Sequence, residues 1–255
     1  MSVLEYTLLV AAGSILAGFS GALTGLGGGV VIVPLLTLVF GVDIRYAVGA
    51  SLISVIATSS GAAVHYLREG FTNLRLAMLL EVATTLGAVG GAALAGVLPT
   101  HVVAIVFGVV LLLSAFGSAR PAPERDAEHY QVRRVPLGFG LMSVAGALSG
   151  LLGIGSGALK VLAMDGAMEL PFKASTATSS LMIGVTAAAS AGVYLRHGYI
   201  DPGLAMPVML GVLAGALLGA RVFRSAPARP LRIVFALVTV AIGIEMILNG
   251  LRRSL

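Results

Sequence analysis

The stretch GALTGLGGG at residues 21–29 recurs as GALSGLLGIGSG at residues 146–157, and each copy lies within a long apolar run. A glycine in a helix interior costs about 1 kcal/mol relative to alanine and adopts backbone angles that other residues avoid. The two stretches therefore predict two interrupted helices. Because an interruption leaves backbone amides and carbonyls without partners inside the helix, we expect it to serve a function.

The composition predicts a membrane protein. Of the 255 residues, 58% are hydrophobic and 11% are charged, whereas about 25% of the residues of a soluble domain are charged. The positive net charge comes largely from arginines in short connections between apolar runs, where they anchor and orient helices rather than bind nucleic acid. The chain contains no cysteine, which excludes disulfides, thiol nucleophiles and cysteine metal sites.

Apolar runs between charged or proline-containing links predict ten helices. They lie near residues 4–24, 30–41, 46–67, 75–97, 101–118, 136–153, 158–169, 174–195, 203–222 and 231–250. The first lacks the positive start of a cleaved signal peptide, so we expect it to remain as a span. The segments 30–41 and 158–169 are too short to cross, since a helix of about 12 residues covers about 18 Å of a hydrocarbon core about 30 Å thick. Each follows a glycine stretch, so each is expected to be a half-helix or a steep broken crossing.

The duplication extends well beyond the glycines. A constant offset of 128 residues aligns about sixty residues, including YLREGFTNLRLA at 66–77 with YLRHGYIDPGLA at 194–205. A match of this length predicts an internal repeat. We expect a first transmembrane repeat over 1–118, a charged linker over 119–135 and a second transmembrane repeat over 136–255.

The distribution of Lys and Arg predicts how the repeats are oriented. The linker carries Arg120, Arg125, Arg133 and Arg134, which place it in the cytoplasm. An inverted arrangement of the repeats puts more of the remaining Lys and Arg residues on the linker side than a parallel arrangement does. The predicted fold class is therefore an all-α polytopic membrane protein of two homologous helical repeats, inverted, each with a glycine-broken helix. We expect a multi-pass protein of the inner, or plasma, membrane.

Inverted repeats with broken helices are how many secondary transporters build a binding site near the membrane midplane. The first amides of a half-helix lack intrahelical partners and favour an anion. The candidate backbone groups are Gly25, Gly27, Gly28, Gly29, Gly155 and Gly157. The alternative for such patterns is close helix packing, which we favour for Gly211, Gly215 and Gly219.

Lys160 is the most informative single residue, because it follows Gly157 by three positions in an apolar segment. An ionisable group at that depth is a candidate functional residue and points to a negatively charged substrate. The alternatives are an ion pair with Asp165 or extension of the side chain to an interface. Asp165 is itself a candidate for coupling or proton relay, or caps a turn. Glu81 lies six residues after Arg75, which favours an interfacial position over the alternative of a buried proton site.

Hydroxyl groups near the breaks complete the candidate anion site. Four of them form equivalent pairs in the two repeats, Thr24 with Ser149 and Ser51 with Ser179, and further candidates are Ser156 and Thr178. Such groups can replace the hydration of an oxyanion. The alternative is that they bond only to their own helix backbone.

The sequence offers little evidence of catalytic motifs. GFSG at 18–21 matches a short nucleophile pattern of intramembrane serine proteases, but no deep histidine is evident to activate Ser20. The chain has no phosphate-binding GxxxxGK[ST] motif and no dinucleotide-binding GxGxxG motif. We therefore expect no enzyme activity, no cofactor and no metal. The expected partners are a small anion, the lipid bilayer and a proton or another coupling ion, and a homo-oligomer is compatible with the sequence.

The sequence resembles the TauE/SafE family of sulfite and organosulfonate exporters. The motifs that carry the resemblance are GLGGGVVIVPLL at 25–36, AVGASL at 47–52 and GLLGIGSG at 150–157. The resemblance covers nearly the whole chain and implies permeation of sulfite, sulfoacetate or taurine-like sulfonates, coupled to a proton or to the membrane potential. The second repeat departs from the first, since Leu162 stands where the first has Pro34 and Lys160 is added.

We therefore expect a secondary transporter that moves a small sulfur-containing anion by alternating access. Two alternatives stay open at this point. One is a permease for a small carboxylate. The other is a membrane scaffold or assembly subunit without transport activity, for which the arginine-rich linker would be the partner surface.

Overall fold

The structure is a computed structural model that describes residues 3–24, 28–68, 72–119, 132–223 and 228–252. Within these ranges the chain is helical and contains no strand. Its α-helices are α1 (Val3–Thr24), α2 (Gly29–Pro34), α3 (Ile44–Arg68), α4 (Leu74–Val97), α5 (Thr100–Ala119), α6 (Val135–Leu152), α7 (Gly157–Leu162), α8 (Phe172–Arg196), α9 (Pro202–Phe223) and α10 (Ala228–Arg252). Two π-helical turns, η1 (Leu35–Val39) and η2 (Ala163–Ala167), continue α2 and α7.

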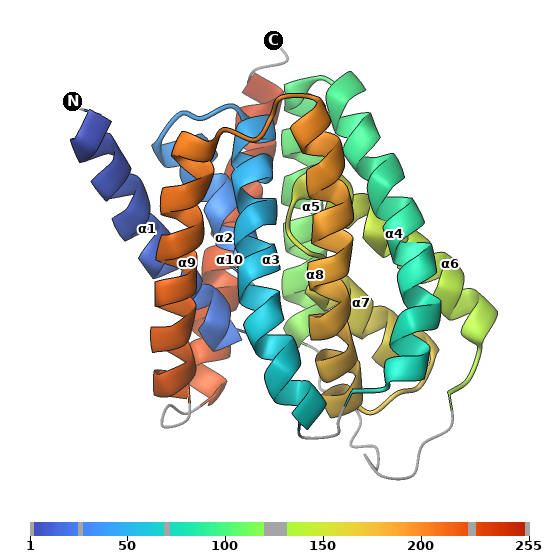
Figure 1. The fold of residues 1–255 in the computed structure, drawn as a ribbon. Coiled ribbons are helices and arrows are strands. Elements are labelled where there is room, and N and C mark those ends of the chain that lie inside the picture. Colours follow the sequence, from blue (N-terminus) through green and yellow to red (C-terminus); the bar gives the residue numbers. More distant parts are fainter. Residues whose placement is uncertain (1–2, 25–27, 69–71, 120–131, 224–227, 253–255) are drawn as a thin grey trace.

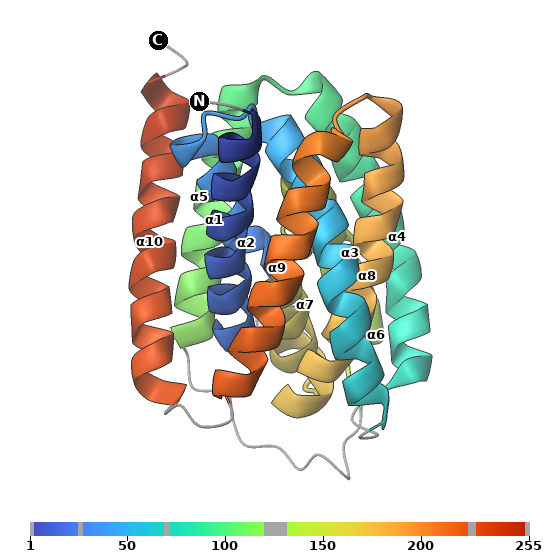
Figure 2. The same cartoon turned by 60° about the vertical axis from the view of Figure 1, so that its left-hand side comes forward.

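The helices predicted from the apolar runs are confirmed, with bounds that differ by a few residues. The two short segments are also confirmed, and neither α2 nor α7 crosses the full height of the bundle (Figures 1 and 2). The widened turns at their ends were not predicted. Each half-helix is bounded by a glycine stretch on one side and by a π-helical turn on the other.

Three of the described helical segments are long and apolar enough to cross a membrane, namely Leu74–Val97, Val135–Leu152 and Ala174–Arg196. Shorter apolar segments lie in α1, α3, α5, α9 and the α2–η1 segment. Large apolar side chains cover the outside of the bundle, for example Leu86 at 69% exposed and Leu113 at 57%. The interior instead contains many hydroxyl side chains. An apolar exterior of this kind is typical of a protein that faces lipid.

The helices pack in related pairs. Helix α1 packs against α9 and α6 against α4, while α3 packs against α8 in the centre and α5 against α10. Figure 1 shows that α1, α3 and α5 run away from the end of the bundle where the N-terminus lies. Helices α6, α8 and α10 start at the opposite end and run back toward it. Helices α1, α3 and α5 thus run opposite to α6, α8 and α10.

Glycines bring the paired helices into backbone contact. A Cβ atom at Gly87 or Gly91 of α4 would overlap the carbonyl oxygen of Ser143 or Ala147 on α6. Gly215 of α9 meets the backbone of α1 in the same way. Small residues allow this close approach in membrane helices, where the interhelical contact is dominated by van der Waals packing. The packing interpretation of the Gly211 and Gly215 pattern agrees with this contact.

Substitution of Gly91 by alanine is expected to destabilise the protein, because the new methyl group overlaps the Ala147 carbonyl. The expected loss is about 1–3 kcal/mol, as for other overpacked sites. Gly90→Ala is the matched control, since a Cβ at Gly90 meets nothing within 4 Å. Thermal unfolding followed by circular dichroism should show a lower midpoint for Gly91→Ala only. Equal midpoints for the two variants would contradict the close α4–α6 contact.

Candidate functional site

The two glycine breaks meet inside the bundle. A Cβ atom at Gly29, the first residue of α2, would lie 2.8 Å from the carbonyl oxygen of Gly153 and 3.2 Å from Cα of Ile154, both in the second break. It would also lie 2.8 Å from Oγ of Ser51 on α3. Only a glycine fits such a contact without displacing backbone. The start of the first half-helix is therefore packed directly on the second break.

The second break turns through left-handed backbone conformations. Gly153 has φ 66° and ends α6, and Gly155 has φ 71°. Ser156 has φ 48° and precedes α7. A non-glycine residue with positive φ is uncommon and costs roughly 1–2 kcal/mol. The backbone at Ser156 is thus strained, and packing against the surrounding helices must stabilise this conformation.

Two of the predicted hydroxyl groups bond to the breaks themselves. Ser51 Oγ donates to the carbonyl oxygen of Gly153 at 2.8 Å, and Ser179 Oγ donates to that of Gly157 at 3.3 Å. Both serines are buried. The Gly153 carbonyl, just past the end of α6, is one that an interrupted helix leaves without a partner, whereas Gly157 is the first residue of α7. The equivalent serines of the predicted repeats therefore hold the second break in place.

Two further predicted hydroxyl groups are buried without a hydrogen-bond partner among the described residues. They are Oγ of Ser149, at the end of α6, and Oγ of Ser156, at the start of α7. An unsatisfied buried hydroxyl costs about 1–3 kcal/mol. These two side chains flank the second break and are available to a polar ligand.

The remaining predicted residues are placed as follows. Gly28 precedes α2, and its carbonyl accepts from the amide of Ile32 at 3.0 Å. Thr178 is buried, and its hydroxyl accepts from the backbone amide of Asn73, so it supports the start of α4. Asp165 lies half-buried in η2. Gly25, Gly27 and the side chain of Thr24 lie outside the described residues.

Lys160 is completely buried, with no exposed surface. It lies in the first turn of α7, where its amide donates to the carbonyl of Ser156 at 3.0 Å. Its Nζ atom donates to Oγ1 of Thr186 on α8 at 2.6 Å. A lysine ammonium carries three donors, and this is its one hydrogen bond to the described part of the chain. The prediction that Lys160 is deep in the protein is confirmed.

Thr186 connects Lys160 to the carboxylate of Glu81. Its Oγ1 atom lies 2.9 Å from Oε1 of Glu81 on α4, and Thr85 also donates to this oxygen at 3.1 Å. The second oxygen, Oε2, is buried and has no partner among the described residues. The interfacial position expected for Glu81 is therefore wrong. The sequence could not show that Glu81 is connected to Lys160, because Thr186 and Lys160 lie on other helices than Glu81.

This polar chain has no counterpart at the positions 128 residues away. The offset of 128 residues places Ile32, Thr58 and Met209 at the positions of Lys160, Thr186 and Glu81. The Thr58 hydroxyl bonds only to carbonyls of its own helix, at 3.1 Å to Ser54 and 3.3 Å to Val55. These related positions thus keep the hydroxyl and lack both charges.

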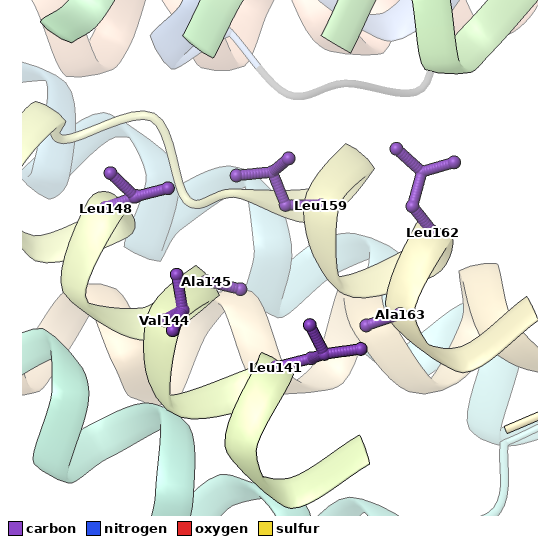
Figure 3. A pocket seen from close by; sticks show the side chains of 7 residues that line it. All are labelled: Leu141, Val144, Ala145, Leu148, Leu159, Leu162 and Ala163. Atoms are coloured by element: carbon purple, nitrogen blue, oxygen red, sulfur yellow. The ribbon is translucent and has the colours of Figure 1, made fainter. Parts of the chain in front are cut away.

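A separate cavity of about 260 Å³ lies between α6 and the α7–η2 segment (Figure 3). Its wall is made of Leu141, Val144, Ala145, Leu148, Leu159, Leu162 and Ala163. Val144 is 58% exposed, so the cavity lies near the outer surface. With no polar side chain in its wall, it is unsuited to an anion. The described residues also contain no group of three or more His, Asp or Glu that could hold a metal ion.

Comparisons with known proteins agree with the sequence resemblance. A family model described as "Sulfite exporter TauE/SafE" matches residues 10–246. The chain is 25% identical to the "Probable membrane transporter protein YunE" of Bacillus subtilis, over 97% of this chain and 99% of that protein. It is 30% identical to a "Probable membrane transporter protein" of Xylella fastidiosa, over 91% of both chains. No solved structure matches the chain.

Loss of the Ser51 hydroxyl is expected to loosen the contact between the breaks. In Ser51→Ala the Gly153 carbonyl loses its buried donor, which costs about 1–3 kcal/mol. Ser60→Ala is the matched control on the same helix, because Ser60 is exposed and bonds only to its own helix at Ile56. Thermal midpoints measured in detergent should fall for Ser51→Ala and stay near wild type for Ser60→Ala. A Ser51→Ala protein as stable as the control would contradict this role.

Proposed function

The chain belongs to the TauE/SafE family of membrane transporters, and on this premise we propose that it carries a small sulfur-containing anion by alternating access. Sulfite and organosulfonates are the proposed substrates. The proposal rests mainly on the burial of Lys160. This cation lies beside a helix break, and its ammonium group has N–H donors that make no hydrogen bond to the described residues. A buried cation is costly unless a negative charge accompanies it.

The groups around the second break suit an oxyanion. Lys160 supplies a positive charge and further N–H donors. Ser149 and Ser156 supply hydroxyl groups with no other partner in the described chain. Hydroxyl and ammonium donors replace the hydration shell that an oxyanion loses on entering the membrane. We place the substrate between these three side chains.

Alternating access follows from the proposed inverted repeats, 1–118 and 136–255, joined by a linker over 119–135. The doubled order of elements and the opposite directions of α1 and α6 support this arrangement (Figure 1). In such transporters one repeat rocks against the other around a fixed site. The glycine contacts between α4 and α6 and between α1 and α9 are the surfaces on which we expect that motion. We propose the inner membrane as the location, with the linker end in the cytoplasm.

Two other functions remain as outcomes of the test. A small carboxylate would use the same donors, because it also presents oxygens with a negative charge. A scaffold without transport would depend instead on the linker, of which residues 120–131 lie outside the described residues. Replacing 120–134 with a neutral linker should leave a transporter's turnover largely intact and abolish a scaffold's activity.

Lys160→Gln is expected to weaken anion binding roughly ten- to a hundredfold, because a hydrogen bond to a charged group contributes about 1.5–3 kcal/mol. The measurement is the rise in thermal midpoint of the purified protein with sulfite, thiosulfate, ethanesulfonate or acetate, since a ligand of the folded state stabilises it. Arg133→Gln is the matched control, because the side chain of Arg133 is 65% exposed and pairs with Glu169 at the surface.

Transport itself is tested in proteoliposomes with the anion that gives the largest thermal shift. Wild type and Arg133→Gln should take up the anion, and Lys160→Gln should be slower at subsaturating concentration. Unchanged affinity and rate in Lys160→Gln would remove Lys160 from the site. A preference for acetate over the sulfur anions would favour the carboxylate alternative, and binding of none of the four would overturn the proposed substrate class.

A further inference from the structure

We propose that Glu81, Thr186 and Lys160 form a proton-coupling site in which one proton on Glu81 accompanies each monovalent anion. The inference rests on the proposed transport function and adds the coupling ion and its position. Three side chains from three helices carry it: Glu81 on α4, Lys160 on α7 and Thr186 on α8. They form a continuous hydrogen-bonded chain at 2.6 Å and 2.9 Å.

The Thr186 hydroxyl can satisfy both protonation states of Glu81. A hydroxyl has one donor and two acceptor positions. Its oxygen accepts from Lys160 and lies 2.9 Å from Oε1 of Glu81 and 2.8 Å from the carbonyl oxygen of Met182. When Glu81 is ionised, the hydroxyl donates to the carboxylate. When Glu81 is protonated, the acid donates to the hydroxyl, which turns to donate to Met182. Neither state leaves the hydroxyl unpaired.

Charge balance links the proton to the anion. With Glu81 ionised and Lys160 protonated, the empty site is neutral. A proton arriving from solution on the carboxylate converts it to the acid and leaves the site with one net positive charge. One monovalent anion then restores neutrality. Because a net charge buried in a protein is unfavourable, the proton and the anion each favour the binding of the other.

Few other charges face this chain. Helix α6, which packs on α4, carries no charged residue between Val135 and Leu152. Helix α8 carries charges only near its two ends, at Lys173 and Arg196. The others on the packed elements are Arg45, His65 and Arg68 on α3, Arg75 on α4, Asp165 on η2 and His101 at the start of α5. Among the side chains that the structure describes, none of these hydrogen-bonds to Glu81 or Lys160. The coupled charges are therefore those of Glu81 and Lys160.

The second half alone contains Lys160, and the position equivalent to Glu81 is Met209. A duplicated pair would give two protonatable sites and a different stoichiometry. One pair predicts one proton for each anion. We place the transferred proton on the carboxylate oxygen Oε1, which lies 2.9 Å from the Thr186 hydroxyl oxygen.

The first test measures proton uptake on anion binding. Wild-type protein in weakly buffered detergent is mixed with ethanesulfonate, a strong-acid anion that stays singly charged, and a pH-indicator dye reports protons taken up. Wild type should take up one proton per bound anion, and Glu81→Gln should bind with none. Glu245→Gln is the control, because Glu245 is an exposed acid on α10 and should behave as wild type. Binding by wild type without proton uptake would overturn the proposal.

The second test needs no substrate. Infrared difference spectra between higher and lower pH should show the carbonyl stretch of a protonated acid that is lost in Glu81→Gln and kept in Glu245→Gln. Thr186→Val should shift this band and Thr186→Ser should restore it, because only serine keeps the hydroxyl. A wild-type spectrum without a Glu81 band would overturn the coupling even if anions bind. A Glu81 band in a protein that binds no probe anion would instead overturn the proposed function.

Discussion

The contact between the two helix breaks is the constraint on which the rest of this structure depends. Gly29 has no room for a side chain beside Gly153 and Ile154, and Ser51 donates to the Gly153 carbonyl in the same place. A membrane interior offers no water to backbone groups that a break releases. The breaks must therefore be enclosed by protein. The central pair α3 and α8 encloses them, and the glycine contacts of α4 and α9 hold the outer helices close.

The helices and their interruptions could be predicted because their causes are local. An apolar run of sufficient length defines a span, and clustered glycines define a break. The depth of Lys160 was also predictable, since it lies in an apolar segment three positions after Gly157. These features depend on neighbours in sequence. Whether the halves are inverted repeats stays a proposal, with the helix directions in its favour.

The hydrogen-bonded partners of the site could not be predicted, because they come from distant segments. Thr186 joins Glu81 across 105 residues and Lys160 across 26 residues. In the sequence, Glu81 has a nearby arginine and resembles an interfacial acid. Thr178 was predicted as a substrate ligand for the same reason, because its partner is distant in sequence. Its hydroxyl is occupied by the amide of Asn73, also 105 residues away, and supports a helix start.

A proline is not what causes the π-helical turns at the ends of the half-helices. Pro34 lies directly before η1, where a missing amide donor could widen the helix. Leu162 stands at the equivalent place before η2, yet the same π-helical turn forms there. The turn therefore follows from packing that both halves share. The second half needs no proline before its π-helical turn. Its sequence also differs from that of the first half beside the glycine break, where it has Lys160 in place of Ile32. A second buried lysine in the first half would add another desolvation penalty and repel the first, so a shared architecture with a single buried lysine is the less costly arrangement.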